Sequence, residues 1–262
     1  MNVQTYHGTM GKPRIAIPIP TSFDPEYNER SWPQYAKAVE RSGGEPVAVP
    51  LGDEAAAADL VKSCDGVLLP GSGADVEPSK FGQPRDPNSA NPDSQREQID
   101  ALLLESAEQQ SKPVLAICFG TQMLNVWRGG TLIQHLSESP VNHRQRGVTE
   151  AHLAEVAPDS LLARAAGLNG SANSEMFHVE QSAACIAVNS SHHQAIATAG
   201  QGLRVVAKSS GDGVIEAVED ESGKQFLLGV QWHPERTYDE SRESKAIFDR
   251  FISEAANRQT KS

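Results

Sequence analysis

The stretch Pro113-Val-Leu-Ala-Ile-Cys118-Phe-Gly-Thr-Gln-Met-Leu124 decides how this chain folds. Residues 114–117 form a short apolar run that predicts a buried strand, and residues 121–126 predict the first turns of a helix. Gly120 permits a tight turn between the two. Cys118 therefore stands at the corner where the strand becomes a helix.

A cysteine at such a corner exposes its sulfur to the first unpaired N–H groups of the helix, whose dipole favours thiolate over thiol. A buried structural cysteine is the common alternative, because free cysteine is among the most buried residue types. The flanking residues favour a nucleophile, since Ala116, Cys118 and Gly120 stand where the nucleophile elbow of hydrolases has Gly-x-Ser-x-Gly. In that geometry the N–H group of Phe119 points at the developing oxyanion.

A second oxyanion donor has to come from another loop. Asp65-Gly-Val-Leu-Leu-Pro70-Gly-Ser-Gly73 predicts a short strand and then a loop of small residues, where backbone amides can approach a ligand closely. On its own such a segment is more often a plain strand-to-loop turn. It becomes informative only beside the corner at Cys118.

A cysteine nucleophile needs a general base, and the base needs a group that fixes its tautomer. Gly229-Val-Gln-Trp-His233-Pro-Glu235 offers both. Pro234 biases His233 toward an extended backbone, in which residues two apart lie on the same side, so Glu235 can orient the imidazole. A solvated loop explains an isolated His-x-Glu pair at least as well. Together with the corner at Cys118, the pair predicts a catalytic site.

The two motifs Cys118-Phe-Gly-Thr-Gln122 and His233-Pro-Glu235 resemble those of the class I glutamine amidotransferase superfamily, Cys-x-Gly-x-Gln followed far downstream by His-Pro-Glu. Further segments between Ile15 and Phe251 resemble its free-standing γ-glutamyl-γ-aminobutyrate hydrolase branch, peptidase family C26. These segments are Pro70-Gly-Ser-Gly-Ala-Asp-Val-Glu-Pro78, Lys80-Phe-Gly82, Asn125-Val-Trp-Arg-Gly-Gly-Thr-Leu132, Val188-Asn-Ser-Ser-His-His-Gln194, Asp212-Gly-Val-Ile-Glu-Ala217 and Gly229-Val-Gln-Trp232.

The resemblance implies an enzyme that hydrolyses the amide bond of a small γ-glutamyl substrate through a thioester and releases glutamate. It implies a Cys-His-Glu triad in which the cysteine attacks, the histidine moves protons and the glutamate orients the histidine. The implied site residues are Cys118, His233 and Glu235 as the triad, the Ser72 and Phe119 amides as the oxyanion hole, and Gln122, His192 and His143 in the substrate pocket.

Three features depart from the pattern of that branch. Many members have arginine directly after the nucleophile, where this chain has Phe119, and the usual Arg-Asp pair is Arg96-Glu97 here. Residues 168–184 form a longer segment than the corresponding one in relatives, either a lid or a surface loop. A glutaminase subunit that hands ammonia to a separate synthase, and a binding protein that keeps the fold without the chemistry, stay open as alternatives. The leaving amine cannot be read from these residues.

The charge balance limits the partners. The 262 residues include 23 Lys and Arg against 34 Asp and Glu, a net charge of -11, and no basic cluster interrupts the acidic excess. We therefore expect no nucleic-acid partner and no membrane partner. No apolar run approaches the ~20 residues of a membrane span, and the N-terminus lacks a secretory apolar region, which predicts a cytoplasmic protein. Assembly into a homo-oligomer stays open.

Cysteine and histidine spacing predicts no metal and no other cofactor. The three cysteines, Cys64, Cys118 and Cys185, are too few and too scattered for a disulfide framework or a Cys-x-x-Cys metal site. His192 and His193 are adjacent, so their side chains diverge in an extended segment, which argues against a shared metal ion.

Alternating strand and helix patterns predict a flavodoxin-like α/β fold, an open, mostly parallel sheet with helices on both faces and the nucleophile elbow at its edge. We expect a disordered lead-in over residues 1–11 and a single domain over residues 12–262. The expected strands are 14–18, 46–49, 66–69, 114–117, 151–156, 185–188, 203–208, 214–218 and 225–230, and the expected helices are 31–42, 53–62, 94–109 and 240–256. Residues 77–91 are expected to form a long loop at the pocket rim.

Overall fold

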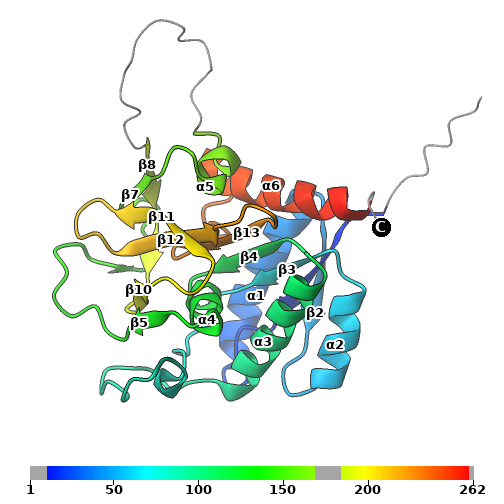
Figure 1. Ribbon diagram of the computed structural model, residues 1–262, viewed down its shortest axis with the longest axis horizontal. Helices are drawn as coiled ribbons and strands as arrows, with labels where there is room; N and C mark the ends of the chain where they lie inside the picture. The colour runs from blue at the N-terminus through cyan, green and yellow to red at the C-terminus, as the bar shows by residue number, and fades with distance from the viewer. Residues whose placement is uncertain (1–10, 169–183, 260–262) are drawn as a thin grey trace, which may run out of the picture.

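The computed structural model describes residues 11–168 and 184–259, which are coloured in Figure 1. Five parallel strands form one half of its main sheet. They are β1 (Arg14–Pro18), β2 (Glu45–Val49), β3 (Gly66–Leu69), β4 (Val114–Ile117) and β13 (Leu227–Val230). Every residue of β3 and β4 is buried, as expected for central strands that helices cover on both faces.

Antiparallel strands continue the sheet beyond β13. They are β12 (Ile215–Asp220), β11 (Leu203–Ser209), β7 (His152–Val156) and β8 (Ala184–Val188), with β10 (Ala195–Thr198) and β5 (Thr131–Ile133) joined at the side of β12. The main strand order is β2-β1-β3-β4-β13-β12-β11-β7-β8. A separate two-stranded ribbon pairs β6 (Arg144–Gln145) with β9 (Ser190–Ser191).

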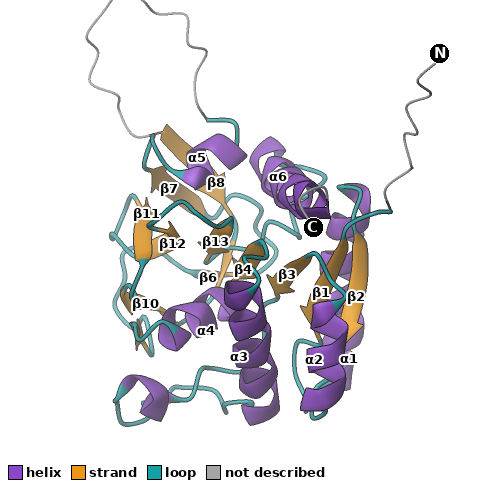
Figure 2. Cartoon of the chain, turned by 45° about the vertical axis from the view of Figure 1, so that its right-hand side comes forward, coloured by secondary structure: helices purple, strands orange, loops and turns teal. Residues whose placement is uncertain are grey.

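Helices cover both faces of the parallel half, as Figure 2 shows. One face carries α1 (Pro25–Arg41) and α6 (Arg242–Gln259), and α5 (Leu161–Ala165) packs beside α6 against β12 of the antiparallel half. The apolar side chains of these three helices join one buried cluster. The other face carries α2 (Glu54–Lys62), α3 (Ser94–Gln109) and α4 (Phe119–Trp127), which join a second cluster. The predicted fold class is therefore confirmed, with an antiparallel extension that the sequence indicated as a series of short strands.

The boundary predictions failed mainly at α1. The helix was expected to begin at Ser31, but it begins six residues earlier, at Pro25. The Asp24 side chain accepts a hydrogen bond from the Tyr27 N–H group at 2.9 Å and so caps the helix, and proline suits the first helical position. The expected loop over residues 77–91 contains a short 3-10 helix, Pro78–Phe81.

The described residues omit parts of two predicted segments. Residues 1–10 of the expected lead-in and residues 169–183 of the expected insertion lie outside them. None of the described helices combines the length and the apolar character that crossing a bilayer requires.

The parallel half of the sheet brings distant segments together. The neighbouring strands β3, β4 and β13 run in the same direction, so their carboxyl ends meet at one edge. The segments that leave this edge are Pro70–Gly73 after β3, Cys118 after β4, and residues 231–235 after β13. Ligands bind outside the carboxyl ends of strands in open α/β sheets, which makes this edge the place to look for a site.

Candidate active site

Cys118 lies at the sharp corner between β4 and α4, with φ +52° and ψ −107°. A positive φ is strained for any residue with a Cβ atom, and such strain is typical of functional sites. The corner is held by the Cys118 N–H group, which donates to the Val230 carbonyl at 2.8 Å. A Cβ atom at Gly120 would lie 2.4 Å from the Leu69 carbonyl oxygen, so only glycine fits after the corner.

His233 and Glu235 form a buried pair just after β13. His233 Nδ1 lies 2.7 Å from Glu235 Oε1, and both side chains are almost fully buried. The Asn189 side chain binds the backbone of His233. Its Oδ1 accepts from the His233 N–H group at 2.9 Å, and its Nδ2 donates to the His233 carbonyl at 2.7 Å. His233 is therefore held both at its backbone and at its imidazole ring.

Cys118 and His233 meet across Gly71. A Cβ atom built on Gly71 would lie 2.8 Å from His233 Cε1 and 3.6 Å from Cys118 Cβ, so both side chains flank this glycine. Nδ1 of the imidazole is hydrogen bonded to Glu235, so Nε2 is the nitrogen that can exchange a proton with Cys118. The loop after β3 thus packs closely against both side chains, and a residue with a Cβ atom at position 71 would displace the imidazole.

The protonation states of the pair depend on each other. Burial would lower the pKa of His233, but the Glu235 carboxylate beside it and a hydrogen bond with Cys118 raise this pKa above its ordinary value. Burial would raise the pKa of Glu235, but the charge of His233 and its hydrogen bond lower it. The site therefore favours an imidazolium beside an ionised carboxylate.

Two backbone N–H groups remain open beside Cys118. The Gly71 N–H group donates to the Tyr35 hydroxyl at 3.0 Å and is therefore occupied. The N–H groups of Ser72 and Phe119 have no acceptor within residues 11–168 and 184–259. The structure thus leaves the two predicted amides available, one from the β3 loop and one from the first turn of α4.

Gln122 does not face open space. Its Nε2 donates to the Gln194 carbonyl at 3.1 Å and to Gln231 Oε1 at 3.2 Å, and the side chain is buried. It joins α4 to the segments after β9 and β13. Its predicted contact with the glutamyl end of a substrate stays a prediction.

The two predicted pocket histidines lie deeper than their motifs suggested. His192 lines a cavity with one side, but it is only 5% exposed, and its Nδ1 donates to the Gln194 carbonyl at 2.8 Å. Burial and the neighbouring His143 lower the pKa of His192 to about 3, so its ring is neutral. His143 does not line that cavity, because it is 3% exposed and packs behind His192.

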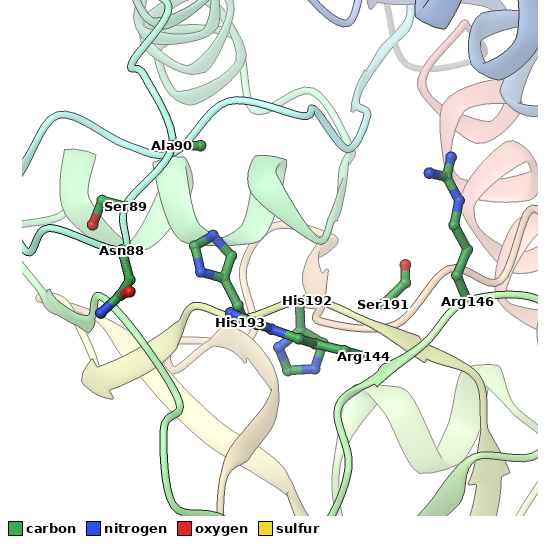
Figure 3. Close-up of a pocket in the computed structure, with 8 residues that line it drawn as sticks. All are labelled: Asn88, Ser89, Ala90, Arg144, Arg146, Ser191, His192 and His193. Carbon is green, nitrogen blue, oxygen red and sulfur yellow. The ribbon is translucent and has the colours of Figure 1, made fainter.

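The cavity measures about 390 Å³ and opens at the surface (Figure 3). Figure 3 shows residues 88–90, from the expected rim loop, on one side and Ser191 with Arg146 on the other. Its lining residues are Asn88, Ser89, Ala90, Arg144, Arg146, Ser191, His192 and His193. The volume lies within the range of small-molecule sites.

Sequence reasoning missed the tyrosine and arginine side chains around the cysteine. Burial raises the pKa of Tyr27, as do the charges of Cys118 and Glu235, whereas Arg236 and Arg146 lower it. Tyr27 therefore lies within electrostatic reach of both the nucleophile corner and the arginine side of the cavity. The Asp24 cap that starts α1 early is the sequence signal that could have placed Tyr27 in the first turn of the helix.

Known proteins resemble this chain over most of its length. The profile of the Peptidase C26 family matches residues 21–235. The chain is 31% identical to Protein NtpR of Enterococcus hirae over 226 residues, 84% of this chain and 87% of that protein. It is 32% identical to gamma-glutamyl-gamma-aminobutyrate hydrolase PuuD of Escherichia coli strain K12 over 223 residues, 84% of each chain.

The fold also resembles solved structures of lower identity. The glutaminase domain of Trypanosoma brucei CTPS with bound acivicin superposes with a TM-score of 0.57 at 16% identity, over 94% of each chain. This likeness concerns the arrangement of the sheet and helices. Because the family profile spans most of the chain and relatives above 30% identity align over 84% of it, the protein belongs to the peptidase C26 family.

Proposed function

We propose that this protein is a cysteine hydrolase that cleaves the amide bond of a small γ-glutamyl compound and releases glutamate. The observation that supports it is the placement of Cys118 at a strained corner, across Gly71 from His233, whose other nitrogen is held by Glu235. A nucleophile, a base and a group that orients the base are the parts of a hydrolytic triad.

In the proposed reaction His233 takes the proton of Cys118, and the thiolate attacks the γ-carbonyl carbon of the substrate. The oxyanion accepts hydrogen bonds from the Ser72 and Phe119 N–H groups. When the C–N bond breaks, His233 gives its proton to the leaving amine and a thioester remains on Cys118. Water, deprotonated by His233, then hydrolyses the thioester and frees glutamate. Glu235 keeps the proton-bearing nitrogen of His233 in place throughout.

The leaving amine in this proposal carries a carboxylate. Arg144 and Arg146 line the cavity, and guanidinium groups bind carboxylates through paired hydrogen bonds. Arg236 links the proposed triad to this cavity, because its Nε lies 3.5 Å from Glu235 Oε1 and its Nη1 donates to the hydroxyl of Ser191, a lining residue, at 2.7 Å. The amine named for the Escherichia coli relative, γ-aminobutyrate, has such a carboxylate, whereas the ammonia released from glutamine needs no cavity of this kind.

The test compares glutamate release from γ-glutamyl-γ-aminobutyrate, γ-glutamyl-butylamide and glutamine. Cys118→Ala should abolish release, and Cys185→Ala is the matched control because Cys185 is exposed on β8 and belongs neither to the proposed triad nor to the oxyanion hole. Faster glutamate release from γ-glutamyl-γ-aminobutyrate than from the other two substrates supports the proposal. Release from glutamine alone would instead support a glutaminase subunit, and Cys118-independent release would refute the proposed nucleophile.

A further inference from the structure

Three histidines and a glutamate converge behind the cavity, and we call them the histidine–glutamate cluster. Glu216 Oε1 lies at their centre, 2.9 Å from His152 Nε2, 3.5 Å from His143 Nδ1 and 3.9 Å from His192 Nε2. The four side chains are nearly inaccessible to solvent, with Glu216 fully buried. Four polar side chains from separate segments therefore point at one enclosed point.

Several polar atoms of the cluster lack partners. His152 Nδ1, His192 Nε2 and Glu216 Oε2 are buried and form no hydrogen bond within the described part of the chain. A buried polar atom without a partner carries a desolvation penalty, and for an ionised carboxylate the penalty is larger. Of these atoms, His192 Nε2 and Glu216 Oε2 belong to groups that face each other, since His192 Nε2 lies 3.9 Å from Glu216 Oε1. A cation bound between the two groups would supply the partner that each of them lacks.

The outer contacts of two histidines prepare them as ligands. His192 Nδ1 must carry a proton, because the Gln194 carbonyl at 2.8 Å only accepts, and this leaves the lone pair on Nε2 directed toward Glu216. His143 Nε2 lies 2.8 Å from Asp212 Oδ2, and its Nδ1 lies 3.5 Å from Glu216 Oε1 and 3.4 Å from the Ser190 hydroxyl. A carbonyl or a carboxylate on the far nitrogen is the usual outer partner of a metal-bound histidine.

We propose that the histidine–glutamate cluster binds one divalent transition-metal ion, with Zn²⁺ as the reference ion. His143, His152 and Glu216 each offer one ligand atom, and these three atoms lie within 4.8 Å of one another. His192 Nε2, 3.9 Å from Glu216 Oε1, is the fourth ligand in the proposal. Bonds of about 2.0–2.2 Å in a tetrahedron separate neighbouring ligand atoms by roughly 3.4 Å. The distances of 2.9 to 3.9 Å from Glu216 Oε1 bracket that separation. Three imidazoles and one carboxylate suit Zn²⁺ better than Ca²⁺ or Mg²⁺.

The ion holds the segment that supports the proposed base. His192 belongs to the same short segment as Asn189, which binds both backbone groups of His233, and Gln194, whose carbonyl accepts from Gln122. Binding at His192 fixes this segment against Glu216 of β12. The ion therefore has a positioning role, with no ligand among the proposed triad.

The expectation of no metal, drawn from the sequence, considered the three cysteines and the adjacent pair His192 and His193. The side chains of His192 and His193 do diverge, because His193 Nε2 lies 2.9 Å from Asp75 Oδ1 while His192 turns into the cluster. The other ligand atoms come from positions 143, 152 and 216, far apart along the chain. Their proximity depends on how β6, β7, β9 and β12 assemble.

The test measures metal content in protein prepared without a histidine tag. The protein is stripped with a chelator, incubated with Zn²⁺ or Co²⁺, freed of excess ion and analysed for metal per chain. We expect one ion per chain, and the Co²⁺ form should show the strong visible absorption of tetrahedral coordination. The readout does not use hydrolase activity, so the metal site and the proposed function can fail separately.

Substitutions within the histidine–glutamate cluster test whether the ion binds there. Glu216→Gln and His143→Gln should lose the ion, and Asp212→Asn should weaken its affinity roughly 10- to 100-fold through the outer contact to His143. His135→Gln is the matched control, since His135 contacts His193 rather than the cluster. Circular dichroism and thermal unfolding establish that each variant is folded.

Three outcomes would overturn the proposal. One is wild-type protein that retains no stoichiometric ion after incubation, which does not depend on any variant. Another is full metal content in folded Glu216→Gln and His143→Gln. The third is loss of the ion in His135→Gln alone, which would assign it to the pair formed by His135 and His193, whose Nδ1 atoms lie 3.2 Å apart.

Discussion

Glu235 Oε1 lies 2.7 Å from His233 Nδ1, and the two residues are separated along the chain by one proline. The extended backbone that Pro234 favours puts both side chains on one side, and the surrounding residues bury them. A buried carboxylate this close raises the pKa of the imidazole and fixes its tautomer. The pair therefore sets both the orientation and the charge of the proposed base.

Glu235→Gln should lower kcat by roughly 10³- to 10⁴-fold with the fold intact. Glutamine is close to glutamate in size, but its amide can present the wrong hydrogen-bonding group to Nδ1, so the imidazole loses its tautomer. Cys118→Ala should lose more, because it removes the atom that forms the thioester. Steady-state kinetics on a γ-glutamyl amide compare the two variants. Wild-type kcat in Glu235→Gln would remove Glu235 from the mechanism.

The rate at which Cys118 is alkylated should depend on the charge of His233. Because the pKa of His233 is raised, its imidazolium persists to higher pH than that of an ordinary histidine, and an adjacent imidazolium makes a cysteine more reactive. Glu235→Gln removes the carboxylate that raises this pKa. The imidazolium is then lost at a lower pH, and iodoacetamide should modify Cys118 more slowly near neutral pH than in the wild type.

Mass spectrometry can follow the modification of each cysteine as the pH is varied. Exposed Cys185 in the same molecule serves as the internal control for a cysteine outside the proposed triad. Superimposable pH profiles for Cys118 in the wild type and in Glu235→Gln would show that the carboxylate does not set the charge of the imidazole.

Gly71→Ala should disable the site, whereas Gly73→Ala should not. A Cβ atom at Gly71 would lie 2.8 Å from His233 Cε1 and 3.0 Å from the Tyr35 hydroxyl, so the imidazole has to move. Among the described residues, no atom other than those of Gly73 and its two chain neighbours lies within 4 Å of a Cβ atom built at this position. A displacement of about 1 Å costs roughly 10²-fold in rate, so kcat should fall by at least that factor in Gly71→Ala. Equal kcat values for the two variants would argue against contact between this loop and the base.

The parallel half of the fold could be predicted because its signals are local. The strands β1, β3 and β4 were expected at their observed bounds, since each is a short apolar run between turn residues. The positive φ of Cys118 follows from the same local pattern, a strand that turns at once into a helix. The strands β5 and β10 were missed because they have only three and four residues and depend on each other for pairing.

The environment of the site could be predicted less well than its central residues. His143 and His192 were expected at the substrate pocket, but His143 lies buried against Glu216 and Asp212, which are far downstream of it in the sequence. Contacts between such distant segments depend on sheet order, and sheet order has no local signal. The predicted roles of Cys118, His233 and Glu235 await the kinetic tests.

Arg146→Gln should distinguish substrates by the charge of their leaving amine. Arg146 lines the cavity and is exposed to solvent, so a single ion pair with a carboxylate there is worth about 0.2–1 kcal/mol. The KM for γ-glutamyl-γ-aminobutyrate should therefore rise up to ~5-fold, with little change in kcat, because the contact is made in the ground state as well as the transition state. The KM for γ-glutamyl-butylamide, which has no carboxylate, should stay the same.

Arg204→Gln supplies a control for loss of positive charge, since Arg204 lies on β11 and pairs with Asp159 and Glu219 away from the cavity. If Arg146→Gln and Arg204→Gln alter the KM of both substrates equally, the effect is one of net charge. If Arg146→Gln alters neither, the leaving amine binds elsewhere. An effect confined to Arg146 and to the carboxylate-bearing substrate would place the leaving amine in this cavity, since only a direct contact distinguishes two amides that share the glutamyl half.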